Sequence, residues 1–340
     1  MRLLFPFLFL VMPALAGAAE LIAFRGVHAN FKPFLLGADH CTAIRIEKSG
    51  HSFVENTIAS IQEAFRSGAK VVTVDVQPTL ENDLSRETLV AFSDETLDCR
   101  AVTDCLGGCK CGKEKKCWVR DQSLEFLRKL DIGSGYTFDG GATYPYRGRM
   151  GMMPTIGEIF DTMSLFLDQE IWLNRIDPEG RAGKILLREL KLRDPSLARR
   201  LRMNFDGIPP DEARSLRSLG VQDAAVMGEA AARCLSRYVL LGWSGYFPAA
   251  CRGTSIVVPT RESLGRFFPP LAMFDVTDLL WGWPVQFLLQ AAKHDLRVVA
   301  SQVNTPEDLK AAMDLPLAGI MTSKVEEVGP LYRKYSAAEQ

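Results

Sequence analysis

Polar side chains that could bind a phosphate or a cation follow several short apolar runs of the chain, or lie near their ends. They are Arg25, Asp75, Ser93, Asp94, Asn174 and Arg175. An arginine suits a phosphate because its planar guanidinium donates two parallel hydrogen bonds. A carboxylate beside it suits a divalent cation that neutralises the same phosphate. Each residue alone is weak evidence for such a site, because any strand end may carry a charge merely for solubility.

The apolar runs are rich in Val and Ile and alternate with helical patterns, which is typical of parallel strands buried on both faces. The strong candidates are Leu21–Phe24, Val71–Val76, Leu89–Phe92, Ile171–Asn174, Ser255–Val258, Leu296–Ala300 and Gly319–Thr322, with weaker ones near Met203–Phe205 and Gln222–Met227. This α/β pattern, in a chain of 340 residues, predicts one TIM (β/α)8-type barrel. In such a barrel the reactive groups lie at the carboxyl ends of the strands, where the polar residues stand.

Helix start signals separate several of these strands. Asn56 or Thr57 caps a first predicted helix, Thr305 caps another that opens with Pro306, and Pro154 opens a third. Caps of this kind satisfy the unpaired N–H groups of the first helical turn. The order of elements therefore supports the barrel.

Composition and charge exclude several classes of protein. The chain has 40 basic and 41 acidic residues, a net charge of −1, 47% apolar and 24% charged residues. It is therefore neither a disordered chain nor one whose bulk charge binds nucleic acid. The basic stretch Lys184–Met203 is interpreted as a solvated helix face rather than a patch for anionic surfaces.

The first residues have the pattern of a secretory signal. Met1 and Arg2 precede an apolar run, and small residues follow with a cleavage site after Ala18. We expect a signal peptide over residues 1–18, a single barrel domain over residues 19–335 and no membrane span, since no apolar run is long enough. The predicted location is outside the cytoplasm, either periplasmic or secreted.

Eight cysteines, an even number, predict disulfides in an exported chain. Cys41, Cys99, Cys234 and Cys251 are dispersed, whereas Cys105, Cys109, Cys111 and Cys117 crowd into thirteen residues. The crowded group marks a cysteine-rich insertion at about residues 101–120. A loop with two disulfides is favoured there, and zinc bound by four thiolates is the alternative, since the spacing lacks the paired C-x₂-C of common zinc sites.

The order of the motifs resembles the glycerophosphodiester phosphodiesterase family. The segments that carry the resemblance are Ile22–Gly26, Val54–Thr57, Gly68–Val76, Val90–Asp94, Met153–Glu158, Gln302–Leu309 and Ala318–Thr322. A bacterial exported branch is similar through Asp39–Ala43, Thr96–Arg100, Leu130–Thr137 and Gly242–Arg252. The resemblance covers nearly all of residues 21–330. It implies a phosphodiesterase barrel of the phospholipase C-like kind, whose substrate is a glycerophosphodiester or another phospholipid-derived phosphate ester.

Two departures from the family pattern concern proton transfer. The family uses two histidines, and their positions hold Phe24 and Ser93 here. Phenylalanine cannot transfer a proton, and a serine hydroxyl cannot serve unaided as an acid or base near neutral pH. His28 is the candidate surrogate in the same loop, with His40 and His51 further along the chain.

A third departure concerns the cation. The family binds Ca²⁺ or Mg²⁺ through a Glu-x-Asp pair and a later carboxylate, whereas this chain has Thr73, Asp75 and, on the later strand, Asn174. One carboxylate with a threonine hydroxyl is a poor site for a hard cation, which prefers several oxygen ligands. Metal binding at Asp75 is therefore weakened. The family positions for the substrate and phosphate are kept as Arg25, Glu55, Asn56 and Asp94, with Arg175 where the family has a lysine.

Three functions follow as hypotheses. The favoured one is a phosphate-ester-binding cleft with hydrolysis lost or strongly reduced. The second is an active phosphodiesterase that uses surrogate residues, and the third is an interaction module acting through the cysteine-rich loop.

We also predict two disulfides among the dispersed cysteines, Cys41–Cys99 and Cys234–Cys251. The first two cysteines follow strands on one face of the barrel, and the second two flank one short strand–loop segment.

Overall fold

The computed structural model describes residues 19–32, 41–101, 109, 116–175, 177–226, 228–260 and 276–338. The predicted signal peptide at residues 1–18, His40 and most of the predicted cysteine-rich insertion lie outside the described residues.

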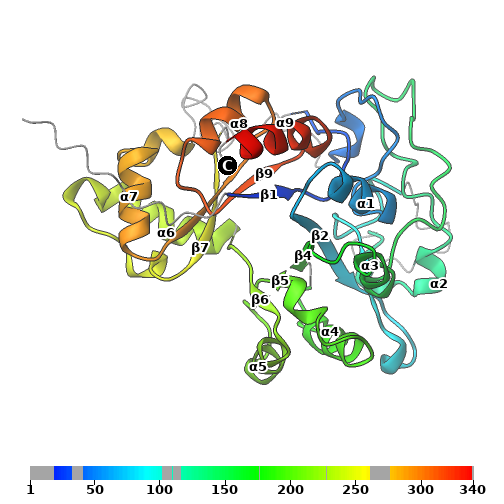
Figure 1. Ribbon diagram of the computed structural model, residues 1–340. Helices are drawn as coiled ribbons and strands as arrows, with labels where there is room; N and C mark the ends of the chain where they lie inside the picture. The colour runs from blue at the N-terminus through cyan, green and yellow to red at the C-terminus, as the bar shows by residue number, and fades with distance from the viewer. Residues whose placement is uncertain are drawn as a thin grey trace, which may run out of the picture.

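Within the described residues, eight parallel strands follow one another around a curled sheet in chain order (Figure 1). They are β1 (Glu20–Ala23), β2 (Val71–Pro78), β4 (Glu170–Arg175), β5 (Leu201–Met203), β6 (Gln222–Asp223), β7 (Ser255–Pro259), β8 (Arg297–Ser301) and β9 (Gly319–Thr322). A parallel bridge between Val226 and Ile256 joins the two ends of the sheet. The predicted α/β barrel is therefore confirmed.

The run predicted as a third barrel strand has a different role. β3 (Leu89–Ala91) pairs antiparallel with the end of β2, through Val76–Pro78. The connection between these strands is too short for the crossover that a parallel pair requires, so the chain turns back on itself. β3 therefore extends β2 beyond the barrel and carries Ser93 and Asp94 to the mouth.

Side chains of β2 alternate between two cores. Val72, Val74 and Val76 pack outward against the helices, whereas Val71 packs inward with residues such as Trp172. Because successive residues of a strand point to opposite faces, Thr73 and Asp75 continue the inward series toward the carboxyl end of the barrel. Barrel geometry thus places these two polar groups in the mouth.

Helices cover the outside of the sheet. They are α1 (Ile58–Arg66), α3 (Ile156–Met163), α4 (Ala182–Lys191), α5 (Pro210–Leu219), α6 (Gly228–Leu241), α7 (Val285–Lys293), α8 (Pro306–Met313) and α9 (Val325–Ala338), with the short α2 (Leu124–Leu127) in the β3–α3 connection. Short 3-10 turns are η1 (Ala43–Arg45), η2 (Leu84–Arg86), η3 (Val119–Asp121), η4 (Ala198–Arg200), η5 (Gly242–Ser244), η6 (Ala249–Cys251) and η9 (Val276–Leu279). None of the described helices combines the length and apolar character that crossing a membrane requires.

The predicted caps are confirmed, with one shift. The hydroxyls of Thr57 and Thr305 accept hydrogen bonds from the first turns of α1 and α8. α3 begins two residues after Pro154, where Thr155 and Glu158 form a reciprocal capping box.

The basic stretch 184–203 divides between two environments. On α4, Lys184 and Lys191 are exposed, as expected for a solvated helix face. Arg202 instead belongs to β5 and pairs with Glu20 at 2.7 Å and Glu170 at 2.6 Å. These ion pairs join β5 to β1 and β4 at the amino end of the barrel, so this part of the stretch is structural.

A second hydrophobic cluster stands beside the barrel mouth. The long connection between β3 and α3, residues 92–155, contributes Leu97, Tyr136 and Tyr146, and the connection after β1 contributes Ala43 and Ile46. The excursion from the barrel is therefore longer than the predicted cysteine-rich insertion of about 101–120. It forms one wall of the site described below.

Candidate functional site

The end of β1 presents Arg25 in an uncommon backbone conformation. Its φ is 60°, in the left-handed region, and its N–H donates to Thr73 Oγ1 at 2.9 Å. The neighbouring Asn56 has a φ of 58° and donates its N–H to the Arg25 carbonyl at 3.0 Å. Such residues store about 1–3 kcal/mol of strain each and cluster at functional sites. The fold therefore holds the Arg25 side chain in a defined place.

The Arg25 guanidinium lies among acidic groups at the mouth. Its Nε is 2.5 Å from Asp75 Oδ2 and its Nη1 is 3.7 Å from Glu55 Oε1. Its side chain keeps 20% exposure, and the Phe24 ring centroid lies 4.7 Å from its Cζ. Arg25 is thus anchored on one edge and partly open to an incoming anion.

Ser93 belongs to a hydrogen-bond chain below Arg25. Its hydroxyl donates to Glu55 Oε1 at 2.6 Å and accepts from Asn56 Nδ2 at 2.7 Å. Asn56 Oδ1 in turn accepts the Asp75 N–H at 3.1 Å. The structure therefore brings together the predicted residues Arg25, Glu55, Asn56 and Asp75 with Ser93, the residue that the motif resemblance aligns with a family histidine.

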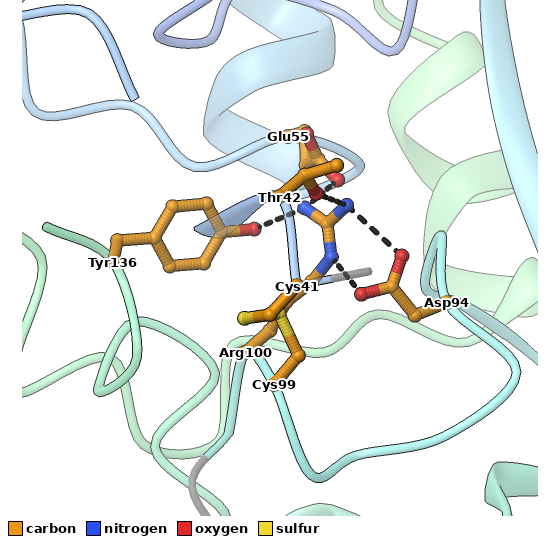
Figure 2. Close-up of a disulfide and its surroundings, with 7 residues drawn as sticks. All are labelled: Cys41, Thr42, Glu55, Asp94, Cys99, Arg100 and Tyr136. Atoms are coloured by element: carbon orange, nitrogen blue, oxygen red, sulfur yellow. Dashed lines mark hydrogen bonds and ion pairs between the residues drawn. A yellow bond between two sulfur atoms is a disulfide. The ribbon is translucent and has the colours of Figure 1, made fainter. Parts of the chain in front are cut away.

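Arg100 is the central residue that the sequence did not single out for the site. It is 1% exposed and makes five hydrogen bonds (Figure 2). Its guanidinium holds Asp94 through two bonds of 2.6 and 3.0 Å and reaches Glu55. The remaining bonds go to Tyr136 at 2.7 Å and Thr42 at 3.0 Å. Because all of its donors are engaged, Arg100 supports the site and does not bind a ligand.

The sequence feature that points to Arg100 is its position directly after Cys99. The predicted Cys41–Cys99 disulfide is confirmed, with a Cα–Cα distance of 5.3 Å. The bond joins the residues that precede Thr42 and Arg100, so it fixes both ends of the Arg100–Thr42 contact (Figure 2). The motifs around Cys41 and Cys99 thus build one structural unit.

The ionisation of the site follows from these pairs. Burial alone would raise the pKa of Glu55, but Arg100, Arg25, His28 and the Ser93 hydroxyl lower it to about 2. Burial by itself lowers the pKa of the Arg100 guanidinium, but Glu55, Tyr136 and Asp94 raise it overall. Burial also raises the pKa of Tyr136 above its ordinary value. Glu55 is therefore a carboxylate at neutral pH and too weak a base to activate Ser93.

His28 is buried beside the site. Its Nδ1 lies 2.8 Å from the Ala29 carbonyl and its Nε2 lies 3.0 Å from the Phe24 carbonyl. Burial lowers the pKa of its imidazole, although the charge of Glu55 acts to raise it. Both ring nitrogens therefore face backbone oxygens of the loop. His51 lies elsewhere on the rim, 3.6 Å from Glu326.

The donor groups do not fit a Ca²⁺ or Mg²⁺ ion. Thr73 Oγ1 already accepts the Arg25 N–H, and Asp75 faces Arg25 with one oxygen and accepts from Asn174 at 3.0 Å with the other. Glu55 and Asp94 are paired with Arg100. Within the part of the chain that the structure describes, no group of three His, Cys, Asp or Glu side chains could hold a metal ion. Each of the carboxylates that a cation would need is thus already paired with a guanidinium group.

Arg175 does not lie with Arg25 and the carboxylates at the mouth of the barrel. Asn174 points inward to Asp75, so the next residue of β4 points to the opposite face. There the Arg175 guanidinium donates to the Asp206 carbonyl. The geometry gives no support to its predicted role as a phosphate ligand beside Arg25.

The other cysteines also form disulfides. Cys234–Cys251 is confirmed, although Cys234 lies within α6 rather than beside a strand. Cys109–Cys117 is a disulfide, which agrees with the preferred interpretation of the crowded group over zinc. Cys105 and Cys111 lie outside the described residues.

Comparisons with known proteins agree with the motif resemblance. The model of the glycerophosphoryl diester phosphodiesterase family matches residues 48–179. The glycerophosphoryl diester phosphodiesterase domain of a Mycobacterium tuberculosis protein has a similar structure, with a TM-score of 0.57 and 15% identity, covering 92% of this chain and 99% of that one. A glycerophosphodiester phosphodiesterase from Agrobacterium tumefaciens gives a TM-score of 0.51 and 12% identity, with coverage of 92% and 99%. At these identities the structural likeness shows the fold. No curated protein matches the chain significantly.

Proposed function

We propose that this chain, which belongs to the glycerophosphoryl diester phosphodiesterase family, binds a glycerophosphodiester or a related phosphate ester at Arg25 and has lost most or all hydrolysis. The observation that carries the proposal is the contrast between two neighbours that directly follow β1. Arg25 is held in a strained, partly open position, whereas Phe24 occupies the place of a proton-transferring histidine.

The Arg25 guanidinium supplies the binding. Asp75 anchors its Nε, and Arg100 pairs with both Glu55 and Asp94. Because the Arg25 side chain stays 20% exposed, its outer N–H groups can donate to phosphate oxygens. Because the carboxylates are already paired with arginines, this binding does not depend on a divalent cation.

The groups needed for hydrolysis are not in place. Each positioned acid or base typically contributes 10²- to 10⁴-fold to the rate. Phe24 supplies no proton, and the Ser93 hydroxyl donates to a carboxylate whose pKa is about 2. Two such losses leave a slow enzyme or a binding protein.

Calorimetric titration with sn-glycerol 3-phosphate and glycerophosphocholine tests the proposal, in EDTA and then with Ca²⁺. We expect saturable binding that EDTA does not remove, and at least tenfold weaker binding in Arg25→Ala. Lys191→Ala is the matched control, because Lys191 is an exposed cation on α4. Equal weakening in both variants would mean diffuse electrostatic attraction. Absence of binding would favour the hypothesis of an interaction module.

An assay for released glycerol 3-phosphate tests the remaining hypothesis, an active phosphodiesterase that uses surrogate residues. We expect turnover far below the usual enzymatic range of about 1–10³ s⁻¹. Turnover within that range would establish an active enzyme, and His28→Gln would then show whether His28 is the surrogate.

We also propose that the chain is exported. Its three described disulfides support an oxidising compartment, since thiols are kept reduced in most cytosols. Amino-terminal sequencing of the protein made in a Gram-negative host should begin at Ala19. An uncleaved chain with reduced cysteines in the cytoplasm would contradict this location.

A further inference from the structure

Exposed apolar side chains gather where α6 and α7 meet. They come from the end of α6 with the following turn and from the segment before α7, and they are Leu240, Leu241, Trp243, Tyr246, Leu279 and Trp281. Leu240 is 70% exposed, Trp243 66% and Trp281 52%. We call this group the α6–α7 edge. Other exposed apolar residues such as Leu165, Leu167 and Leu192 belong to separate parts of the chain.

The α6–α7 edge is continuous across its two segments. Trp281 Nε1 donates to the Val239 carbonyl at 3.1 Å, and the Tyr238 hydroxyl donates to the Trp281 carbonyl at 3.1 Å. Beneath it, the rings of Tyr238 and Phe287 pack with centroids 5.0 Å apart. α6 and α7 lie together at one end of the molecule, away from α1 to α3 (Figure 1).

The edge is also preformed. The indole N–H groups of Trp243 and Trp281 are already bound to backbone carbonyls, so the exposed rings need no further polar partner. The Cys234–Cys251 disulfide fastens α6 to the turn that precedes β7. A rigid aromatic surface loses little conformational entropy when something covers it.

The charged residues around the α6–α7 edge indicate what kind of partner would cover it. Residues 231–260 contain three arginines and no Asp or Glu, and the segment before α7, residues 276–284, contains one exposed acidic residue, Asp278. Arg233 and Arg237 precede Leu240 by seven and three positions, so helical spacing places them on its face of α6, and Arg237 and Arg252 are exposed. Trp and Leu side chains beside arginines are typical of surfaces that enter the headgroup region of anionic bilayers. A second copy packed by two-fold symmetry would instead bring arginines against arginines.

We propose that the α6–α7 edge docks on a bilayer surface that contains anionic phospholipid. Leu240, Trp243 and Trp281 enter the interfacial region, and Arg237 and Arg252 contact lipid phosphates. This docking is independent of the Arg25 site. It would hold the chain where phospholipid-derived phosphate esters are released.

Vesicle co-sedimentation tests the docking. The purified chain is mixed with vesicles of phosphatidylcholine alone or with 30% phosphatidylglycerol. We expect binding to the anionic vesicles that weakens with salt, and at least tenfold weaker binding in Leu240→Ser/Trp243→Ser. Arg237→Gln/Arg252→Gln should weaken it by about fivefold for each arginine, since one basic residue near such a surface contributes about 1 kcal/mol.

Matched variants separate the outcomes. Leu165→Ser/Leu167→Ser removes two leucines that are 71% and 74% exposed elsewhere and should bind vesicles normally. Arg25→Ala should also bind normally, which keeps this test distinct from the phosphate-ester test. No binding to anionic vesicles, or equal loss in the Leu165/Leu167 control, would overturn the proposal. So would a lipid-free dimer, seen by light scattering, that Leu240→Ser/Trp243→Ser dissociates.

Discussion

A phosphodiesterase needs both proton transfer and phosphate binding, and Phe24 and Arg25 bear on one of these each. The Arg25 guanidinium lies 4.7 Å from the Phe24 ring centroid, which is a cation–π distance. The ring thus helps to hold the arginine, as an imidazole of similar size could, but it transfers no proton. Under the proposed function, phenylalanine at this position removes proton transfer and leaves the anion-binding arginine in place.

Restoring the imidazoles should raise hydrolysis. We expect Phe24→His/Ser93→His to increase the rate of glycerol 3-phosphate release at least 10²-fold over the native chain, because barrel strand ends hold side chains on rigid elements. Adding Thr73→Glu beside Asp75 should make the remaining activity depend on Ca²⁺ or Mg²⁺. The measurement is an initial rate with glycerophosphocholine.

Phe24→Asn/Ser93→Asn is the matched control, since asparagine is polar and does not titrate. If both double variants give the native rate while remaining folded, the restored groups do not reach the reacting atoms. The family positions would then no longer define an active geometry in this chain.

Removal of Arg100 should destabilise the molecule strongly. Arg100→Met leaves Glu55 and Asp94 without their cation, and breaking a buried pair in this way typically costs 3–5 kcal/mol. Arg100→Lys keeps the charge but supplies three donors in place of five, so its loss should be smaller. Urea unfolding at pH 7 measures both. A loss below about 1 kcal/mol in Arg100→Met would show that the carboxylates find other partners.

At the scale of elements, periodicity and caps were enough to predict the strands and several helices. β3 was misassigned because a short apolar run reads the same in a parallel and an antiparallel strand. Arg100 was missed because three of its five hydrogen bonds, to Glu55, Tyr136 and Thr42, join it to segments far apart in the chain, which no local pattern encodes. Arg175 and Asn174 both stand at the end of the same predicted strand, so both were expected near the site. Because successive side chains of a strand alternate, Arg175 points away from the mouth.

The Cys41–Cys99 disulfide should stabilise the fold more than Cys234–Cys251. The two bonds span 58 and 17 residues, and loop entropy gives about 4 and about 3 kcal/mol respectively. Loss of the first bond also loosens Arg100. We therefore expect Cys41→Ser/Cys99→Ser to lower the urea midpoint further than Cys234→Ser/Cys251→Ser. The reverse order would mean that the Arg100 network stands without its disulfide.

At the scale of the whole molecule, arginine pairs brace both ends of the barrel. Arg202 joins β5 to Glu20 and Glu170 at the amino end, and Arg25 and Arg100 hold the carboxylates at the mouth. Hydrophobic packing of the strands supplies the bulk of the stability. The ion pairs make part of it depend on the carboxylates remaining ionised.

Stability should therefore fall in acid, with Glu55 as a main cause. The pKa of Glu55 is lowered from 4.5 to about 2 in the folded chain. The unfolded chain thus takes up a proton first, so the stabilisation is complete above pH 4.5 and is lost as the pH falls toward 2. The difference corresponds to about 3 kcal/mol. His28 adds to the decline below about pH 6.5, because burial lowers its pKa and unfolding lets it protonate.

Urea unfolding between pH 7 and pH 3 measures this dependence. Glu55→Gln should be less stable than the native chain at pH 7, and the difference should narrow as the pH falls below 4.5. Glu125→Gln is the control, because Glu125 and its partner Lys129 are both exposed, and an exposed ion pair contributes little to stability. Its curve should follow the native one. A constant difference between Glu55→Gln and the native chain from pH 7 to pH 3 would mean that Glu55 stabilises the mouth through its shape and hydrogen bonds rather than through its charge.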